Sequence, residues 1–213
     1  MRYNSKIKYI IRWVTFFLLI LNSILAKNAG GKLTEISDYY LGKTPFDLKF
    51  SIKNIDDKGN VLSQMQGSFI LKNTNSFKVI YPQEELLFDG EWLWSYNKNT
   101  NQVVVEEFEP TSSLNLIYDV INGKMDNYRI VKSETQDDYQ KIFLKPEDDN
   151  NFFQQVNLTA VKDTGRIDHL KYVDFQNNQI LIYFLQLSST SIDDSSFYDI
   201  KNIKDQELID LRP

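Results

Sequence analysis

The chain has 213 residues, a length typical of one domain that is large enough to bury its own hydrophobic core. It contains no cysteine and one histidine. This excludes disulfides, thiolate metal sites and a cysteine nucleophile, and it argues against histidine-based metal sites and Ser-His-Asp catalysis. The formal net charge of −5 disfavours nucleic acid as a partner, and an aromatic content of 14% is typical of a sheet-rich protein.

The first 26 residues have the pattern of a secretory signal peptide. A basic segment, residues 1–12, precedes an apolar stretch at 13–21 that is shorter than a bilayer-spanning helix, and Ala26 is a small residue suited to the position before cleavage. We expect cleavage between Ala26 and Lys27, which leaves residues 27–213 as a single soluble domain in the periplasm. The alternative is that the apolar stretch stays uncleaved as an N-terminal anchor.

Apolar residues alternate with polar ones through most of the mature chain, which predicts β-strands. Turn clusters separate the strands at intervals typical of one large antiparallel sheet, and a sheet of this size is expected to curl toward a barrel or half-barrel. Gly67 lies inside one strand and suggests a bulge or bend there. We predict strands at 46–52, 61–72, 77–81, 86–88, 92–96, 103–105, 128–130, 139–144, 152–161, 166–175 and 180–187.

Two segments with helical spacing interrupt the strand pattern. Leu33, Ile36 and Tyr40 predict a short amphipathic helix that ends near Gly42, and residues 114–121 predict a second helix after a proline. These helices can cover the apolar concave face that an open half-barrel exposes. We therefore predict a mainly β (α+β) fold, an unclosed antiparallel β-barrel of about 10–11 strands with a lid of two or three short helices.

No group of residues has the pattern of a catalytic, metal or cofactor site. The adjacent acid pairs fall in predicted turns, where solvated turn residues are the simpler interpretation, and none has the spacing of a calcium loop. His169 alternates with Leu170 and is expected to be an exposed strand residue on the opposite face. What remains is apolar surface, which in open barrels commonly binds small or lipid-like ligands.

A series of short motifs follows in order between residues 67 and 103. They are Gly-Ser-Phe-Ile-Leu-Lys at 67–72, Phe-Lys-Val-Ile-Tyr-Pro at 77–82, Leu-Phe-Asp-Gly at 87–90, Leu-Trp-Ser-Tyr at 93–96 and Asn-Gln-Val at 101–103. Their order and spacing resemble the LolA family of bacterial outer-membrane lipoprotein carriers. The resemblance implies an unclosed antiparallel barrel with a helical lid, in agreement with the strand and helix pattern.

The resemblance also implies a function. Such a carrier binds the acyl chains of lipoproteins without catalysis or a cofactor, accepts them from an inner-membrane ABC transporter and delivers them to an outer-membrane acceptor. Since that acceptor is itself a lipoprotein, the absence of cysteine favours the soluble carrier, which we expect to be a monomer. The alternative is a periplasmic protein of the same fold that binds another lipid, a glycolipid or a protein partner. An esterase is disfavoured because no serine has a histidine nearby.

The resemblance and the strand alternation together suggest the residues of an acyl-chain site. Phe77 matches a family phenylalanine implicated in transfer, and Asn73 replaces an arginine that holds the lid closed in the family, so closure here is weaker or depends on other residues. Lys72 is expected on the opposite face of its strand. The expected lipid-binding residues are Phe50, Phe69, Leu71, Phe77, Val79, Trp94, Leu114, Leu116, Ile117 and Leu170, with Asn73 as the lid contact.

Overall fold

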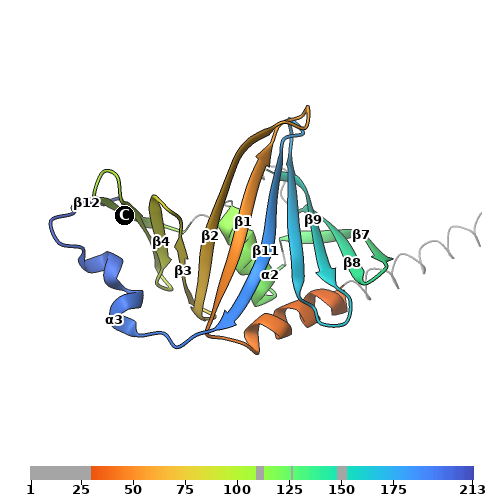
Figure 1. Cartoon of the computed structure of the whole chain (residues 1–213), viewed down its shortest axis with the longest axis horizontal. Coiled ribbons are helices and arrows are strands. Elements are labelled where there is room, and N and C mark those ends of the chain that lie inside the picture. The colour runs from red at the N-terminus through yellow and green to blue at the C-terminus, as the bar shows by residue number, and fades with distance from the viewer. Residues whose placement is uncertain (1–29, 109–112, 126, 148–152) are drawn as a thin grey trace, which may run out of the picture.

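The computed structural model describes residues 30–108, 113–125, 127–147 and 153–213, and these form one curved, twelve-stranded sheet (Figure 1). The order of strands across the sheet is β12-β6-β5-β4-β3-β2-β1-β11-β10-β9-β8-β7. The strands are β1 (Phe46–Ile55), β2 (Val61–Asn73), β3 (Ser76–Ile80), β4 (Glu84–Phe88), β5 (Trp92–Asn97), β6 (Gln102–Glu107), β7 (Tyr128–Gln136), β8 (Tyr139–Pro146), β9 (Phe153–Val161), β10 (Ile167–Asp174), β11 (Gln179–Ser189) and β12 (Glu207–Asp210).

The predicted unclosed antiparallel barrel is confirmed, because β12 and β7 lie at opposite ends of the strand order and do not pair with each other. All eleven predicted strands are present, and neighbouring strands of this set are antiparallel. The sheet has one strand more than expected. β12 pairs with β6 in parallel and covers that edge of the sheet.

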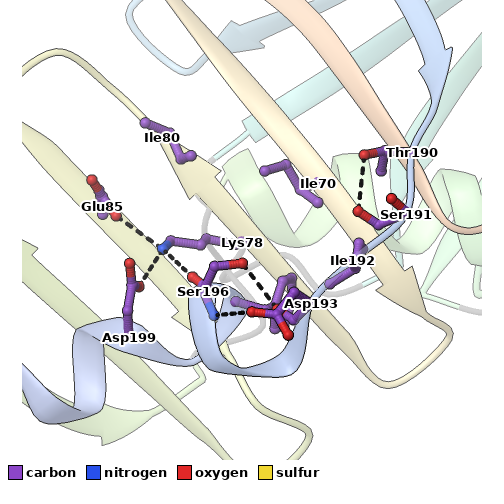
Figure 2. A pocket seen from close by; sticks show the side chains of 11 residues that line it. Ile70, Lys78, Ile80, Glu85, Thr190, Ser191, Ile192, Asp193, Ser196 and Asp199 are labelled. Atoms are coloured by element: carbon purple, nitrogen blue, oxygen red, sulfur yellow. Dashed lines mark hydrogen bonds and ion pairs between the residues drawn. The ribbon is translucent and has the colours of Figure 1, made fainter.

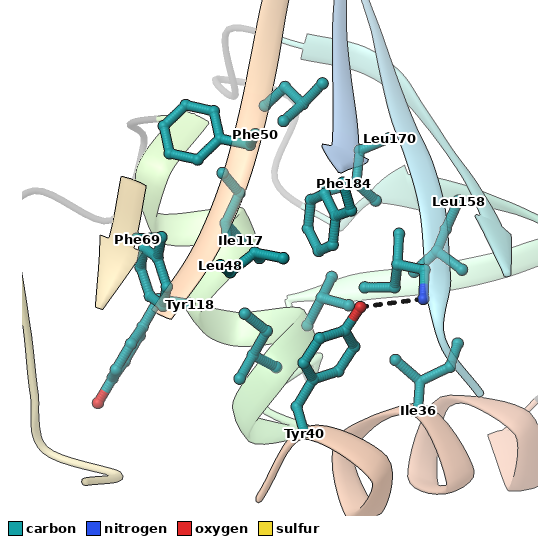
Figure 3. Close-up of a cluster of buried hydrophobic side chains, with 14 of the residues drawn as sticks. Ile36, Tyr40, Leu48, Phe50, Phe69, Ile117, Tyr118, Leu158, Leu170 and Phe184 are labelled. Atoms are coloured by element: carbon teal, nitrogen blue, oxygen red, sulfur yellow. Dashed lines mark hydrogen bonds between the residues drawn. The ribbon is translucent and has the colours of Figure 1, made fainter. Parts of the chain in front are cut away.

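Two helices cover the concave face of the sheet. One comprises residues 30–41, and the other is α2 (Ser113–Asn122). Side chains of both helices join the concave strand faces in one buried cluster, which includes Ile36, Tyr40 and Ile117 (Figure 3). None of the helices within the described residues has the length and apolar character of a bilayer-spanning segment.

The helix at residues 30–41 is held firmly against the end of the β9–β10 hairpin. The Tyr40 hydroxyl accepts a hydrogen bond from the Ile167 backbone N–H at 3.0 Å, and Lys32 Nζ donates to the Lys162 carbonyl. Gly165 lies so close to this helix that an added Cβ would approach the Glu35 carbonyl oxygen to 2.8 Å. These contacts fix the helix at one end of the half-barrel, and α2 packs beside it.

The C-terminal segment, residues 190–213, lies on the convex face and includes α3 (Asp194–Phe197), the 3-10 helix η1 (Asp199–Asn202) and β12. Phe197 and Ile200 are buried there against Leu87 and Val103 of the sheet. α3 and η1 are therefore not part of the lid, which in the described residues consists of the helix at 30–41 and α2.

Asp89 anchors this C-terminal segment to the sheet. One carboxylate oxygen accepts hydrogen bonds from Lys201 Nζ at 2.5 Å and Trp94 Nε1 at 2.9 Å, and the other accepts from the backbone N–H groups of Glu91 and Trp92. Burial alone would raise the pKa of Asp89, but these hydrogen bonds outweigh it and lower the pKa to about 2. The Asp-Gly and Leu-Trp-Ser-Tyr motifs thus help to hold the C-terminal segment in place.

Gly67 does not form the bulge that its position suggested. It pairs regularly with Phe50 across the β1–β2 ladder. The Phe50 ring lies directly over it, and an added Cβ at Gly67 would be 2.7 Å from Phe50 Cζ. The physical reason for glycine here is the space that this ring needs.

Candidate functional site

The candidate site is an aromatic cluster where α2 meets the concave face of β2, β3 and β4. Phe77 is fully buried at its centre, with ring centroids 5.1 Å from Tyr118 of α2, 5.2 Å from Phe69 and 5.5 Å from Phe88 and Phe108. These contacts are in the range of favourable edge and offset aromatic packing. The cluster connects α2 to this half of the sheet through Tyr118.

Most of the sequence-predicted lipid-binding residues come together in the same buried cluster. They belong to strands in both halves of the sheet, on its concave face, and to α2, and each is at most 1% exposed. The site is thus a continuous apolar surface that the two helices cover, without a charged group among these residues. The residues are Phe50, Phe69, Leu71, Phe77, Val79, Ile117 and Leu170.

Two further predicted residues, Leu114 and Leu116, lie within α2, but their side chains are outside the described part of the structure. The predicted signal peptide, residues 1–26, also lies outside the described residues. Their predicted roles therefore stay predictions.

The placement of Trp94 in this site was wrong. Trp94 pairs with Leu87 across the β4–β5 ladder, and both side chains lie on the convex face, in the cluster with Phe197 and Ile200. The concave residue at this point of β5 is Leu93, which packs against the main cluster. Because the segment has apolar residues at consecutive positions, alternation alone could not tell which of them points inward.

The role of Asn73 as the lid contact stays a prediction, because the contacts described for its side chain lie within the β2–β3 turn. The Asn73 side-chain oxygen accepts hydrogen bonds from Asn75 N at 2.8 Å and Ser76 Oγ at 3.1 Å, so it stabilises the β2–β3 turn. The lid is connected to this turn by Tyr118 of α2, whose hydroxyl donates a hydrogen bond to the Thr74 carbonyl. As expected, Lys72 points to the opposite face, where it pairs with Asp194 at 2.5 Å.

The helix α2 carries a largely buried acid, Asp119. Asp119 of α2 is only 8% exposed, and burial raises its pKa to about 6, although the nearby Lys124 opposes this shift. Complete burial raises the pKa of Tyr172 well above its usual range, and the charges of Tyr128 and Asp119 add to this shift. The lid helix is therefore most stable in its packed position when Asp119 is protonated.

Sequence reasoning missed several members of the site, namely Tyr40, Phe88, Phe108 and Tyr118. Tyr118 could have been found, because it is one residue from Ile117 on the predicted lid helix and carries the only hydroxyl in the segment 114–121. The other three depend on contacts between elements that are distant in sequence.

The described residues contain no group of three or more histidine and acidic side chains placed to bind a metal ion. His169 lies on the convex face, opposite Leu170 as predicted, but it is only 27% exposed at its side chain. Its ring nitrogens contact Asp168 Oδ2 at 2.8 Å and Thr159 Oγ1 at 3.2 Å. The bulge at Asp168 in the β9–β10 ladder brings these neighbours to the same face.

Two curated proteins match part of the chain in sequence. The outer-membrane lipoprotein carrier protein of Halorhodospira halophila is 32% identical over 98 residues, which cover 44% of this chain and 47% of that protein. The carrier protein of Alkalilimnicola ehrlichii is 28% identical over 85 residues, 38% of this chain and 39% of the relative. The chain thus matches less than half the length of these curated relatives.

A solved structure of an uncharacterized conserved protein from Thermus thermophilus shares the fold. It is 12% identical and superposes with a TM-score of 0.53 over 83% of this chain and 98% of its own. The family model for the outer membrane lipoprotein carrier protein LolA matches residues 43–199, from just before β1 to the start of η1. The chain therefore belongs to the LolA family.

Proposed function

We propose that this protein is a periplasmic carrier that binds the acyl chains of lipoproteins beneath its lid and does no chemistry on them. The observation that carries the proposal is the continuous apolar surface on the concave face, with Phe77 at its centre, covered by two helices. Family membership and the names of the curated relatives support the same function.

The packing of the closed site suggests how the carrier works. Phe50, Phe69 and Phe77 are fully buried against other side chains, so an acyl chain can enter only when these contacts are replaced by contacts with lipid. The helix at 30–41 is fixed by Tyr40 and Gly165, whereas α2 contacts β3 and β4 through the aromatic cluster. We infer that α2 moves and that the helix at 30–41 stays in place.

The energetics permit reversible loading. Burial of a chain of about 16 carbons at about 0.8 kcal/mol per methylene would provide of the order of 10 kcal/mol before costs. Opening the lid and ordering the chain reduce this gain, so that the cargo can still leave. The aromatic contacts between Phe77, Phe88 and Tyr118 are what the acyl chain must replace.

We infer that the mature chain is residues 27–213, a monomeric single domain released after signal-peptide cleavage. It would accept cargo from an inner-membrane ABC transporter and deliver it to an outer-membrane acceptor. Recovery of the full-length chain in the membrane fraction would contradict this route.

Native mass spectrometry of the protein purified from periplasm tests the function. We expect the mature chain with co-purified triacylated peptides, and their loss when Phe77 is replaced by glutamate in a protein that still folds. Phospholipid, glycolipid or a protein partner in place of acylated peptides would instead support a different ligand for the same fold.

A further inference from the structure

A pocket lies on the convex face, between the sheet and the C-terminal segment, away from the acyl-chain site (Figure 2). The chain leaves β11 at Ser189, crosses β2 and β3, and packs against the sheet again at Phe197. The space left beneath this crossing has a volume of about 370 Å³.

One wall of the pocket is apolar and comprises Ile70, Ile80, Ile192 and Phe197. The other is built around Lys78, whose Nζ lies 3.1 Å from Glu85 Oε2, 2.6 Å from Asp199 Oδ1 and 3.5 Å from the Ser196 carbonyl (Figure 2). Since three acceptors surround this buried ammonium group, Lys78 fastens the C-terminal segment to the sheet and has no capacity left for a ligand.

The segment that borders the pocket has free backbone groups. Thr190 N still donates to the Pro45 carbonyl, but within the described residues no hydrogen bond is formed by the backbone N–H groups of Ser191, Ile192 and Asp193. The segment is outside any helix or strand. A backbone of this kind can pair with an added extended peptide, as the edge of a sheet does.

Two carboxylates at the pocket also retain acceptor capacity. Asp193 Oδ2 accepts hydrogen bonds from Ser196 N, which caps α3, and from Ser195 Oγ. Asp199 Oδ1 accepts from Lys78 Nζ. Within the described residues Asp199 Oδ2 has no partner, and the Asp199 side chain is 57% exposed. The exposed Asp193 carboxylate is solvated and can accept a further hydrogen bond. Ammonium or guanidinium groups are the donors that such exposed carboxylates bind best.

We propose that this pocket binds an extended segment of a partner protein that carries one aliphatic side chain beside a lysine or arginine. The aliphatic side chain lies between Ile70, Ile80 and Ile192, the basic group contacts Asp193 or Asp199, and the peptide backbone pairs with Ser191–Asp193. Because only a few residues are contacted, the interaction is weak and transient. It is independent of acyl carriage, since the two sites lie on opposite faces of the sheet.

Titration of the full chain with the peptide Ac-Ala-Leu-Arg-Ala-NH2, followed by amide NMR shifts, tests this proposal. We expect saturable shifts at residues 190–193 and at Ile70 and Ile80. Matched peptides with alanine in place of leucine, or glutamate in place of arginine, should bind at least about tenfold more weakly. Equal shifts with all three peptides, or none with the first, would refute the proposal.

Two tryptophan variants separate pocket binding from general effects. Ser191 is exposed and lines the pocket, so Ser191→Trp should fill it and weaken binding by at least about tenfold. Asn202 is exposed on the same segment outside the pocket, so Asn202→Trp should leave the affinity within about twofold. Equal affinities in the two variants would overturn the assignment. Both variants should bind a fluorescent fatty acid as the unmodified chain does. If the unmodified chain does not bind the fatty acid, the proposal of acyl carriage fails, but the proposal for this pocket does not.

Discussion

The hydrogen bond between Tyr118 and Thr74 should set how readily the lid opens. Tyr118→Phe removes the hydroxyl but keeps the ring contacts with Phe77, Phe88 and Phe108. A neutral hydrogen bond contributes about 0.5–1.5 kcal/mol, and the exposed Thr74 can be hydrated once the bond is lost, so the lower half of this range applies. If the free energy that favours the closed lid falls by about 0.5–1 kcal/mol, the population with an open lid rises roughly two- to fivefold.

Hydrogen exchange of the α2 amides measures this population directly. Tyr118→Phe should speed exchange at residues 117–121 by about two- to fivefold and accelerate release of bound acyl chains. Tyr96→Phe is the matched control, because its hydroxyl donates to Asn101 Oδ1 at 3.1 Å on the convex face, far from α2. If both variants exchange alike at α2, closure does not depend on the Tyr118 hydroxyl.

Three further changes have defined outcomes. Gly67→Ala should destabilise the fold by about 1–3 kcal/mol in urea unfolding, because the added Cβ collides with the buried Phe50 ring. Gly31→Ala is the control and should not destabilise the fold, because no atom lies within 4 Å of the added Cβ. Equal effects of the two variants would contradict this packing. Asp119→Asn should remove a pH dependence of the free energy of unfolding. Burial raises the pKa of Asp119 in the folded protein to about 6 from its ordinary value of 3.8, so the free energy of unfolding of the wild type should fall by about 2–3 kcal/mol as pH rises from 4 to 7. A flat wild-type profile would exclude this. Asp89→Asn should loosen the C-terminal segment, seen as faster proteolysis at residues 199–204, while α2 exchange stays unchanged; unaltered proteolysis would show that other contacts suffice.

The strands were predictable because burial of one sheet face imposes a period of two on the sequence. The segment 46–52 shows this clearly, and the structure extends it only to Ile55. The two lid helices were predictable from helical spacing, and Gly42 marked the end of the first, which begins at residue 30 and not at Leu33. The concave placement of Phe69, Phe77 and Val79 followed from the same alternation.

The features that were missed depend on contacts between distant segments. β12 has four exposed residues and forms only by parallel pairing with β6, which is about 100 positions earlier in the chain, so no local pattern marks it. Trp94 could be placed only from the convex contacts of Phe197 and Lys201. Asn73 was expected to contact the lid because it replaces a family arginine, but the hydrogen bond described between α2 and this turn comes from Tyr118.

Photo-crosslinking from opposite faces of the sheet tests the central claim most directly. A benzoylphenylalanine at position 77, in the concave cluster, and another at position 94, on the convex face, lie on strands separated only by β4. With a triacylated lipoprotein as cargo, the account predicts a crosslink to the acyl chains from position 77 and none from position 94. A crosslink from position 94, or none from position 77 in a folded protein, would contradict acyl binding beneath the lid.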